Sequence, residues 1–387
     1  MYKYLGLILA ILAVNNIITV TPGLPMAAYY AVFGVVFVLG IIAEQPRFDG
    51  VITLFVLAII FSLVGNTIPD YFKAEQRFVS FLLIFCLLSP WFFNNSLSEI
   101  RRYIFKYTNL LLIAVVVLSF LGNVTGAFSG IGRSDMFQGL TSHSMLLGPI
   151  ASIVMLMAVW KGSQDQVKRK VLLVCIAIVL ICLYTLLLSG SRGSLIGGML
   201  SAIVLLVLAF RRSFSKLIKL GVFLVLLLAA TVPYWSVYTA NIDKKNEYAQ
   251  EEGDNFASRS ELWGYRYEEF QQSPVIGIGF ASANKGEINT VNGRIEPGTS
   301  WGVLFAQLGI LGAIPLIILF ISYFKKLYQR EDYLNKGKLL FALLFFFTIH
   351  MVVEGYILGS GSFMFFYIWL LLGVIKNRIK EKEITIY

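Results

Sequence analysis

The chain has 387 residues, of which 57% are hydrophobic and only 14% are charged, with a formal net charge of +10. A water-soluble domain usually carries about 25% charged residues, so the composition excludes an ordinary soluble domain and indicates a protein that is embedded in lipid. The net charge does not indicate nucleic-acid binding, because the basic residues lie in short clusters between apolar runs, which is the pattern that sets membrane topology.

Apolar runs of about 17 to 25 residues recur along the chain, and each is long enough to cross a hydrocarbon core of about 30 Å as a helix. The short alternating strands of a membrane barrel are absent from the sequence. We therefore expect an all-α polytopic membrane protein with about 12 transmembrane helices, the first of them retained because it lacks a signal-peptide cleavage pattern. The expected spans are residues 4–20, 26–43, 51–69, 78–93, 104–122, 143–160, 171–189, 194–210, 217–235, 301–323, 339–357 and 361–375.

The connections that follow the even-numbered spans, together with both chain ends, hold most of the 32 Lys and Arg residues. Because short cytoplasmic loops carry the excess of basic residues, we expect both termini to be cytoplasmic. The chain then divides into residues 1–235 with the first nine spans, an extracytoplasmic loop subdomain at 236–300, and residues 301–387 with the last three spans and a basic cytoplasmic tail. Function is expected to concentrate in the polar loop.

Three arginines lie on the outer side in this topology, against the general charge bias, namely Arg77, Arg133 and Arg192. Arg192 is flanked by glycines and serines that allow a close approach of the backbone, and a planar guanidinium matches the oxygens of a diphosphate. The alternative is that each arginine extends to the membrane interface or pairs with an acidic neighbour, although Arg192 has no acidic neighbour in the sequence.

The long loop contains a predicted short amphipathic helix. Residues 258–261 (Ser-Arg-Ser-Glu) match a capping box, and Trp263, Tyr267 and Phe270 recur at helical spacing until Pro274. A capping box followed by such spacing, with a proline after it, is the pattern of a helix with defined ends.

On that helix, Arg259 and Arg266 are seven residues apart and lie within about 20° of each other. Arg259 is near the amide-rich N-terminal end, which is a natural phosphate site. Arg259, Arg266 and Trp263 are therefore candidates for binding a phosphorylated substrate. The alternative is a surface helix whose arginines pair with neighbouring glutamates.

Two further pairs of ionisable residues lie near the outer face. Arg294 and Glu296 precede the span that begins near residue 301, where Glu296 is either a general base for a sugar hydroxyl or only the acidic partner of Arg294. His350 and Glu354 are four residues apart on one face of a span, where ionisable groups are costly and often functional. They are candidates for a substrate site, with hydrogen bonding between helices as the alternative, and no metal site is expected because a third ligand is missing.

Residues 189–193 (Ser-Gly-Ser-Arg-Gly) resemble the helix-boundary signature of the bacterial O-antigen ligase and polymerase superfamily. Residues 259–263 (Arg-Ser-Glu-Leu-Trp) and 274–279 (Pro-Val-Ile-Gly-Ile-Gly) resemble the family's loop pattern of an arginine, a tryptophan and then Pro-x-x-Gly-x-Gly. Residues 307–312 (Gln-Leu-Gly-Ile-Leu-Gly) are similar to its following helix, and the resemblance covers residues 77–373.

The resemblance implies a GT-C-like glycosyltransferase of the bacterial inner membrane that transfers a glycan from an undecaprenyl-diphosphate carrier to an acceptor hydroxyl at the periplasmic face. It implies no cofactor and no metal, and the chain shows no motif for ATP or a nucleotide sugar. By resemblance, Arg192 and Arg259 bind the diphosphate and stabilise its charge, with Arg77 as a third candidate. The implied partners are the lipid-linked glycan donor, a glycan or lipid A core acceptor, a chain-length regulator, a flippase and the lipid bilayer.

The ligases of this superfamily carry a His-Asn pair just before the helix that starts here near Trp301, whereas this chain has Glu-Pro-Gly-Thr-Ser at 296–300. The missing histidine favours a polymerase of O-antigen or capsule type, whose acceptor is a sugar hydroxyl of a second lipid-linked repeat unit, and makes Glu296 the expected base. The alternatives are a ligase that moves polymer to lipid A core or to a protein hydroxyl, a lipid-linked oligosaccharide flippase, and a non-catalytic scaffold. The nearly uncharged midspan regions weaken the flippase alternative.

Overall fold

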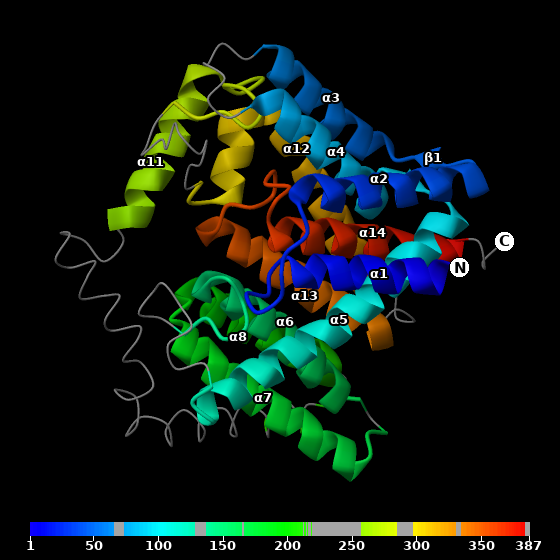
Figure 1. Ribbon diagram of the computed structural model, residues 1–387, viewed down its shortest axis with the longest axis vertical. Helices are drawn as coiled ribbons and strands as arrows, with labels where there is room; N and C mark the ends of the chain where they lie inside the picture. The colour runs from blue at the N-terminus through cyan, green and yellow to red at the C-terminus, as the bar shows by residue number, and fades with distance from the viewer. Residues whose placement is uncertain are drawn as a thin grey trace.

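The computed structural model describes residues 1–65, 73–127, 137–164, 166–211, 213, 215, 218, 257–284, 297–329 and 334–383, with the backbone alone for 257–259, 334–336 and 381–383. These residues form helices and one short antiparallel sheet (Figure 1). The helices are α1 (Tyr2–Asn15), α2 (Met26–Ala43), α3 (Gly50–Val64), α4 (Ala74–Leu88), α5 (Asn95–Val124), α6 (Ser144–Gly162), α7 (Arg169–Ser189), α8 (Arg192–Phe210), α11 (Ala257–Gln272), α12 (Ser300–Gln329), α13 (Leu334–Val353) and α14 (Phe363–Glu383). The strands β1 (Arg47–Phe48) and β2 (Phe92–Phe93) pair with each other.

Eleven of the twelve expected spans coincide with these helices, which confirms an all-α polytopic fold. In the described part of the chain, six helices are long and apolar enough to cross a membrane, namely α2, α5, α6, α7, α8 and α12. Apart from residue 218, the expected span at 217–235 lies outside the described residues, as do residues 236–256 and 285–296 of the long loop. The total of twelve spans and the extracytoplasmic side of the loop therefore stay predictions.

Several helix boundaries differ from the expected spans, and the structure gives a physical reason for the end of α1 and the start of α4. α1 ends at Asn15, because the chain then turns to form an isolated bridge between Ile18 and Thr141. α4 begins at Ala74, ahead of its apolar run, so that Arg77 lies in the first turn of the helix instead of before it. Hydropathy locates the apolar run, whereas backbone hydrogen bonding extends the helix past it.

Polar side chains cap the starts of three helices. The Asp49 carboxylate accepts hydrogen bonds from backbone amides of the first turn of α3, and Asn94 Oδ1 accepts one from Leu97 N at 2.7 Å. At the start of α6, His143 Nδ1 accepts from Met145 N at 3.1 Å. These bonds satisfy amides that a helix cannot pair internally, so His143 has a structural task here.

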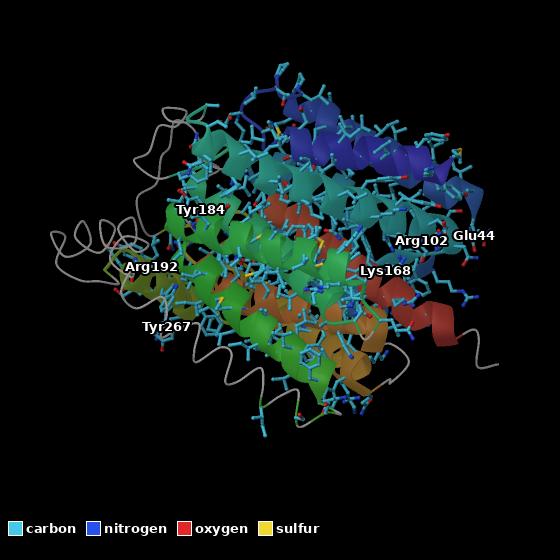
Figure 2. All side chains as sticks on the ribbon, turned by 90° about the horizontal axis from the view of Figure 1, so that it is seen from below. Glu44, Arg102, Lys168, Tyr184, Arg192 and Tyr267 are labelled. Carbon is cyan, nitrogen blue, oxygen red and sulfur yellow. The ribbon has the colours of Figure 1, made fainter. Side chains whose placement is uncertain are left out.

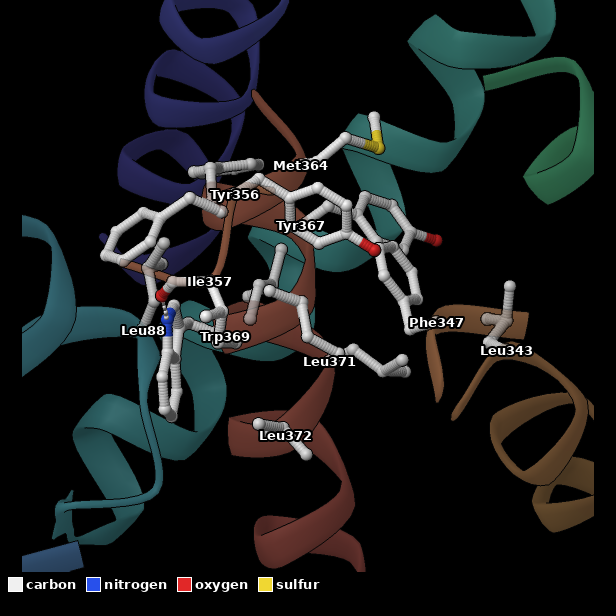
Figure 3. Packing of buried hydrophobic residues seen from close by; sticks show 14 of the residues in the cluster. Leu88, Leu343, Phe347, Tyr356, Ile357, Met364, Tyr367, Trp369, Leu371 and Leu372 are labelled. Atoms are coloured by element: carbon white, nitrogen blue, oxygen red, sulfur yellow. Dashed lines mark hydrogen bonds between the residues drawn. The ribbon is translucent and has the colours of Figure 1, made fainter. Parts of the chain in front are cut away.

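The core is centred on α14, whose aromatic side chains contact several other helices (Figure 3). Trp369 and Tyr367 are fully buried. The Trp369 indole donates to Ile357 O at 3.1 Å, and the Tyr367 hydroxyl donates to Asn109 Oδ1 at 2.7 Å. Each buried polar tip therefore has a partner, and the two bonds fix α14 against the loop before it and against α5.

A buried arginine holds α4, α5 and α14 together. Arg101 is 0% exposed, and its guanidinium donates to the carbonyls of Leu87 and Phe92, each at 2.7 Å, and to Asn377 Oδ1 at 3.4 Å. The carbonyl of Leu87 lies in the last turn of α4 and has no partner within its helix, so the cation replaces a missing backbone donor there. Arg101 is therefore structural, unlike many ionisable groups inside membrane spans.

The start of α1 and the end of α14 lie at one end of the helix bundle, and α11 lies at the opposite end (Figure 1). The labelled side chains divide in the same way in Figure 2, with Arg192 and Tyr267 at one end and Glu44, Arg102 and Lys168 at the other. We call these the α11 end and the terminal end. The side of a membrane on which each end lies stays a prediction.

Candidate functional site

The Ser-Gly-Ser-Arg-Gly segment forms the break between α7 and α8. Gly190 caps α7 in the left-handed conformation with φ 61°, which other residues adopt only at a cost, and α8 begins directly afterwards at Arg192. Gly193 lies against Val353 at the end of α13, where a Cβ atom would collide with the valine side chain. The two glycines are thus explained by geometry, and they place Arg192 at the start of α8 beside the end of α13.

A buried hydrogen-bond chain runs from this break to the loop between α13 and α14. The Ser191 hydroxyl donates to Ser194 Oγ at 2.8 Å, and Ser194 Oγ lies 3.1 Å from His350 Nε2. On the other side of the ring, His350 Nδ1 lies 3.2 Å from the Tyr356 hydroxyl. Because both ring nitrogens of His350 have partners, hydrogen bonding between helices explains this histidine without a metal.

An open groove with a volume of about 560 Å³ lies where α2, α4, α12 and the loop between α13 and α14 meet. Among its described lining residues Arg77 is the charged one, and it is half-buried. Tyr30 on α2 is close enough to Arg77 for an electrostatic interaction. The remaining polar lining is formed by Tyr356, Gln307 and the hydroxyls of Ser80, Ser360 and Ser362.

The hydrogen-bond chain and the groove share Tyr356, which is buried and lines the groove. Arg192 is at the start of α8, and this helix start is linked through Ser194 and His350 to Tyr356. Tyr356 forms part of the groove wall, and Arg77 lines the same groove. Two of the candidate cations, far apart in the sequence, thus belong to one connected part of the structure at the α11 end.

The last two residues of the Glu-Pro-Gly-Thr-Ser segment at 296–300 have a structural role. Ser300 Oγ donates to Glu354 O at 2.6 Å and accepts from Tyr356 N at 2.9 Å, and Thr299 Oγ1 donates to Met351 O at 3.1 Å. These bonds hold the end of α13 and the start of the loop between α13 and α14 in place. Pro297, which directly follows Glu296 in the chain, lines the groove.

The two glycine-containing motifs of the loop and of α12 pack directly on each other. α12 is interrupted at Gly309, whose φ 60° and ψ −163° are not helical. Across this kink, Ile310 N donates to Pro274 O at 2.9 Å, Leu311 N to Val275 O at 3.1 Å, and Ile278 N to Ala306 O at 2.9 Å. The kink exposes backbone groups of α12, and the Pro-x-x-Gly-x-Gly segment pairs with them.

The Gln307 side chain joins this junction to the groove, a role that the sequence motif did not predict. Its Oε1 accepts from Ala281 N at 3.1 Å, its Nε2 donates to Ser282 O at 3.0 Å, and its side chain is in the groove lining. A glutamine side chain close to the helix-interrupting Gly309 can bond to another segment. The sequence does not identify that segment, because residues 281 and 282 are 25 or more positions away.

The predicted loop helix exists as α11, and it turns one arginine inward. Arg266 is 2% exposed, and its Nη1 lies 3.1 Å from the carboxylate of Glu269, which is 0% exposed. Burial lowers the pKa of Arg266 below its usual value, and the nearby Glu269 carboxylate offsets part of this decrease. This is the alternative in which an arginine of this helix pairs with a glutamate.

The remaining candidates are placed as follows. Trp263 is 37% exposed on α11, and the Glu354 side chain is half-buried at the end of α13. Arg259 lies in the first turn of α11, with its side chain outside the described residues. Arg133, Arg294 and Glu296 also lie outside the described residues.

Comparison with known proteins gives one family. The family model described as O-antigen ligase matches residues 176–317, which include the break between α7 and α8, helix α11 and the kinked start of α12. A comparison with curated proteins gives no match. The matched region contains the signature segments at 189–193, 259–263, 274–279 and 307–312 in full, and this match supports the resemblance to the O-antigen ligase and polymerase superfamily.

Proposed function

We propose that this protein is a membrane glycosyltransferase that polymerises undecaprenyl-diphosphate-linked oligosaccharide repeat units at the periplasmic face. The observation that carries the proposal is the connection between Arg77, in an open polar groove, and the helix start with Arg192, through Tyr356, His350 and Ser194. One guanidinium in the groove and a second on the helix start that the hydrogen-bond chain reaches suit a ligand with two phosphates.

In the proposed reaction, a sugar hydroxyl of the acceptor attacks the anomeric carbon of the donor glycan. A new C–O bond forms, the bond from the anomeric carbon to the phosphate oxygen breaks, and undecaprenyl diphosphate leaves with the bonding electrons. Arg77, Arg192 and Arg259 stabilise the charge on the leaving group, which is the main catalytic contribution. Glu296 accepts the hydroxyl proton, and Pro297 beside it lines the groove.

The polar lining suits a carbohydrate. Tyr30, Ser80, Ser360 and Ser362 present hydroxyls to the groove, and Tyr356 adds an aromatic ring. Hydroxyl and amide groups hydrogen-bond to sugar hydroxyls, whereas an apolar groove would leave those hydroxyls unpaired. In this proposal the saccharide lies against the serine-rich loop and the diphosphate lies near the arginines.

The proposal is tested with purified protein and lipid-linked repeat units. Arg192→Ala and Arg259→Ala are expected to abolish the polymer ladder while the protein stays inserted and abundant. Lysine at either position rescues poorly, because it retains the charge and loses the planar fork. Glu296→Gln is expected to slow extension by about 10² to 10⁴. Normal polymer length and yield in both alanine variants would favour a scaffold instead.

An O-antigen ligase is the second candidate, because the matching family model carries that description. The two activities differ in their acceptor. A polymerase extends lipid-linked repeat units when these are the sole saccharide substrate, whereas a ligase forms product only after lipid A core or a protein acceptor is added. A flippase forms no glycosidic bond under either condition.

A further inference from the structure

A second groove, with a volume of about 630 Å³, lies at the terminal end of the bundle, far along the helices from the proposed catalytic groove. It is formed by the start of α5, the end of α6, the start of α13 and the end of α14. None of its lining residues belongs to the O-antigen ligase match at 176–317. The proposed transfer reaction gives this groove no task.

The lining changes from basic to apolar along the helix axes. On α5, Arg102 and Lys106 lie nearer the terminal end, and Leu110 and Ile113 follow deeper in the bundle. At 1.5 Å per residue, the step from Arg102 to Ile113 covers about 16 Å, which is comparable with half of a hydrocarbon core. α6 repeats the order, with Lys161 at its end and Met157 one turn deeper.

The groove has an excess of positive charge. Four of its lining residues are cations, namely Arg102, Lys106, Lys161 and Arg378, and its described lining contains no carboxylate. Glu99 pairs with Arg102 at 2.7 Å, but both side chains are exposed, and an exposed ion pair of this kind holds its partners weakly. The net charge of the described lining residues is therefore positive.

A buried donor adds a specific polar contact. Asn377 is 5% exposed and lines the groove, and its Oδ1 accepts from the buried Arg101. Its Nδ2 has no hydrogen-bond partner within the described part of the chain. A buried amide donor usually has an acceptor, so an oxygen atom of a ligand is expected beside it.

We propose that this groove binds an anionic glycerophospholipid of the leaflet at the terminal end. The phosphate and headgroup oxygens lie among the four cations and accept from Asn377 Nδ2, and the acyl chains follow α5 and α6 inward over Leu110, Ile113 and Met157. Basic pockets between transmembrane helices recognise lipid headgroups by this combination of cations and apolar walls. A free phosphate would leave the apolar half of the groove unfilled.

The test uses the full-length protein in nanodiscs of phosphatidylcholine with a small fraction of phosphatidylglycerol, followed by native mass spectrometry of the retained lipid. The protein is expected to retain phosphatidylglycerol selectively. Each cation near a membrane surface contributes about fivefold in affinity, so Lys106→Ala/Lys161→Ala should weaken retention by about 25-fold. Ile113→Trp keeps every charge and fills the apolar half, so it should also prevent retention.

The matched control removes two lysines from the same end of the bundle but outside the groove. Lys168 and Lys170 are exposed at the start of α7, and Lys168 makes no side-chain capping bond. Lys168→Ala/Lys170→Ala should leave retention unchanged. Equal losses in the two double variants would show general attraction to the bilayer and overturn the proposal.

Three other outcomes would also overturn the proposal. One is equal retention of phosphatidylcholine, because the headgroup charge would then be irrelevant. Another is displacement of the lipid by equimolar inorganic phosphate, which would identify a bare anion site. The last is a retained mass equal to a second copy of the chain, which would assign the groove to a dimer interface.

Discussion

Gly309 interrupts α12 and creates the surface on which the Pro-x-x-Gly-x-Gly segment lies. Its φ 60° and ψ −163° fall in a region that essentially only glycine occupies, and a Cβ atom there would collide with the carbonyl of Val275. Gly277 has φ 75° and faces the backbone of Gln307 with equally little space. The glycines of both motifs are therefore required by the contact between the motifs.

We expect Gly309→Ala to destabilise the protein by at least about 1 to 3 kcal/mol, the cost of a non-glycine residue in this conformation before the collision is added. The measurement is the midpoint of thermal unfolding of the purified protein. Gly264→Ala is the control, because Gly264 lies in α11 with no atom near its Cβ position, and alanine there should leave the midpoint unchanged or raise it. Equal midpoints for the two variants would contradict this account of the kink.

At the scale of elements, the hydrogen-bond chain joins two helices and a loop that are separate in the hydropathy pattern. Ser194 belongs to α8, His350 to α13 and Tyr356 to the loop before α14. Removal of either partner leaves a buried ring nitrogen unsatisfied, at a cost of about 1 to 3 kcal/mol. The three groups are expected to act as a unit, since networks of this kind couple their members.

We predict that the effects of Ser194→Ala and Tyr356→Phe on the free energy of unfolding are not additive, with a coupling energy of at least about 0.5 kcal/mol. The same coupling is expected in the activation free energy that follows from the rate of chain extension. Ser201→Ala is the matched control, because Ser201 is also buried in α8 but its hydroxyl donates locally to Gly197 O at 2.6 Å. Ser201→Ala with Tyr356→Phe should be additive. Additive effects in both pairs would mean that Ser194 and Tyr356 are not energetically coupled, which would contradict this account of the hydrogen-bond chain.

Much of this element scale is predictable from the sequence. Span positions follow from apolar runs, and α11 follows from its capping box and aromatic spacing, because both signals are local. Arg266 shows where local signals end, since spacing placed it on one face with Arg259 but did not show that this face meets the buried Glu269. Gln307 was missed for the same reason, because its partners at residues 281 and 282 are set by the fold.

At the scale of the whole molecule, the two ends of the bundle differ in chemistry. The α11 end has the polar groove with Arg77, and the terminal end has the basic groove around Lys106, the start of α1 and the end of α14. The proposed reaction requires the α11 end to be periplasmic, because the undecaprenyl-linked donor reacts on the periplasmic side after it has crossed the membrane.

Cysteine labelling in intact cells tests this orientation. Tyr267 is 62% exposed on α11, and Lys168 is exposed at the terminal end. Tyr267→Cys should react with an impermeant maleimide, whereas Lys168→Cys should react only after lysis. The background is expected to be low, because Cys175 and Cys182 are buried and Cys86 is half-buried. The reverse labelling pattern would invert the topology.

The most direct test of the central claim is the rate at which purified protein releases undecaprenyl diphosphate from lipid-linked repeat units. If Arg77 stabilises the leaving diphosphate, Arg77→Ala should lower this rate by about 10² to 10³, and Arg77→Lys should recover only part of it. Arg169→Ala, at the exposed start of α7, is the control and should release undecaprenyl diphosphate at the parental rate. Release at the parental rate by Arg77→Ala would contradict the assignment of the groove to the donor.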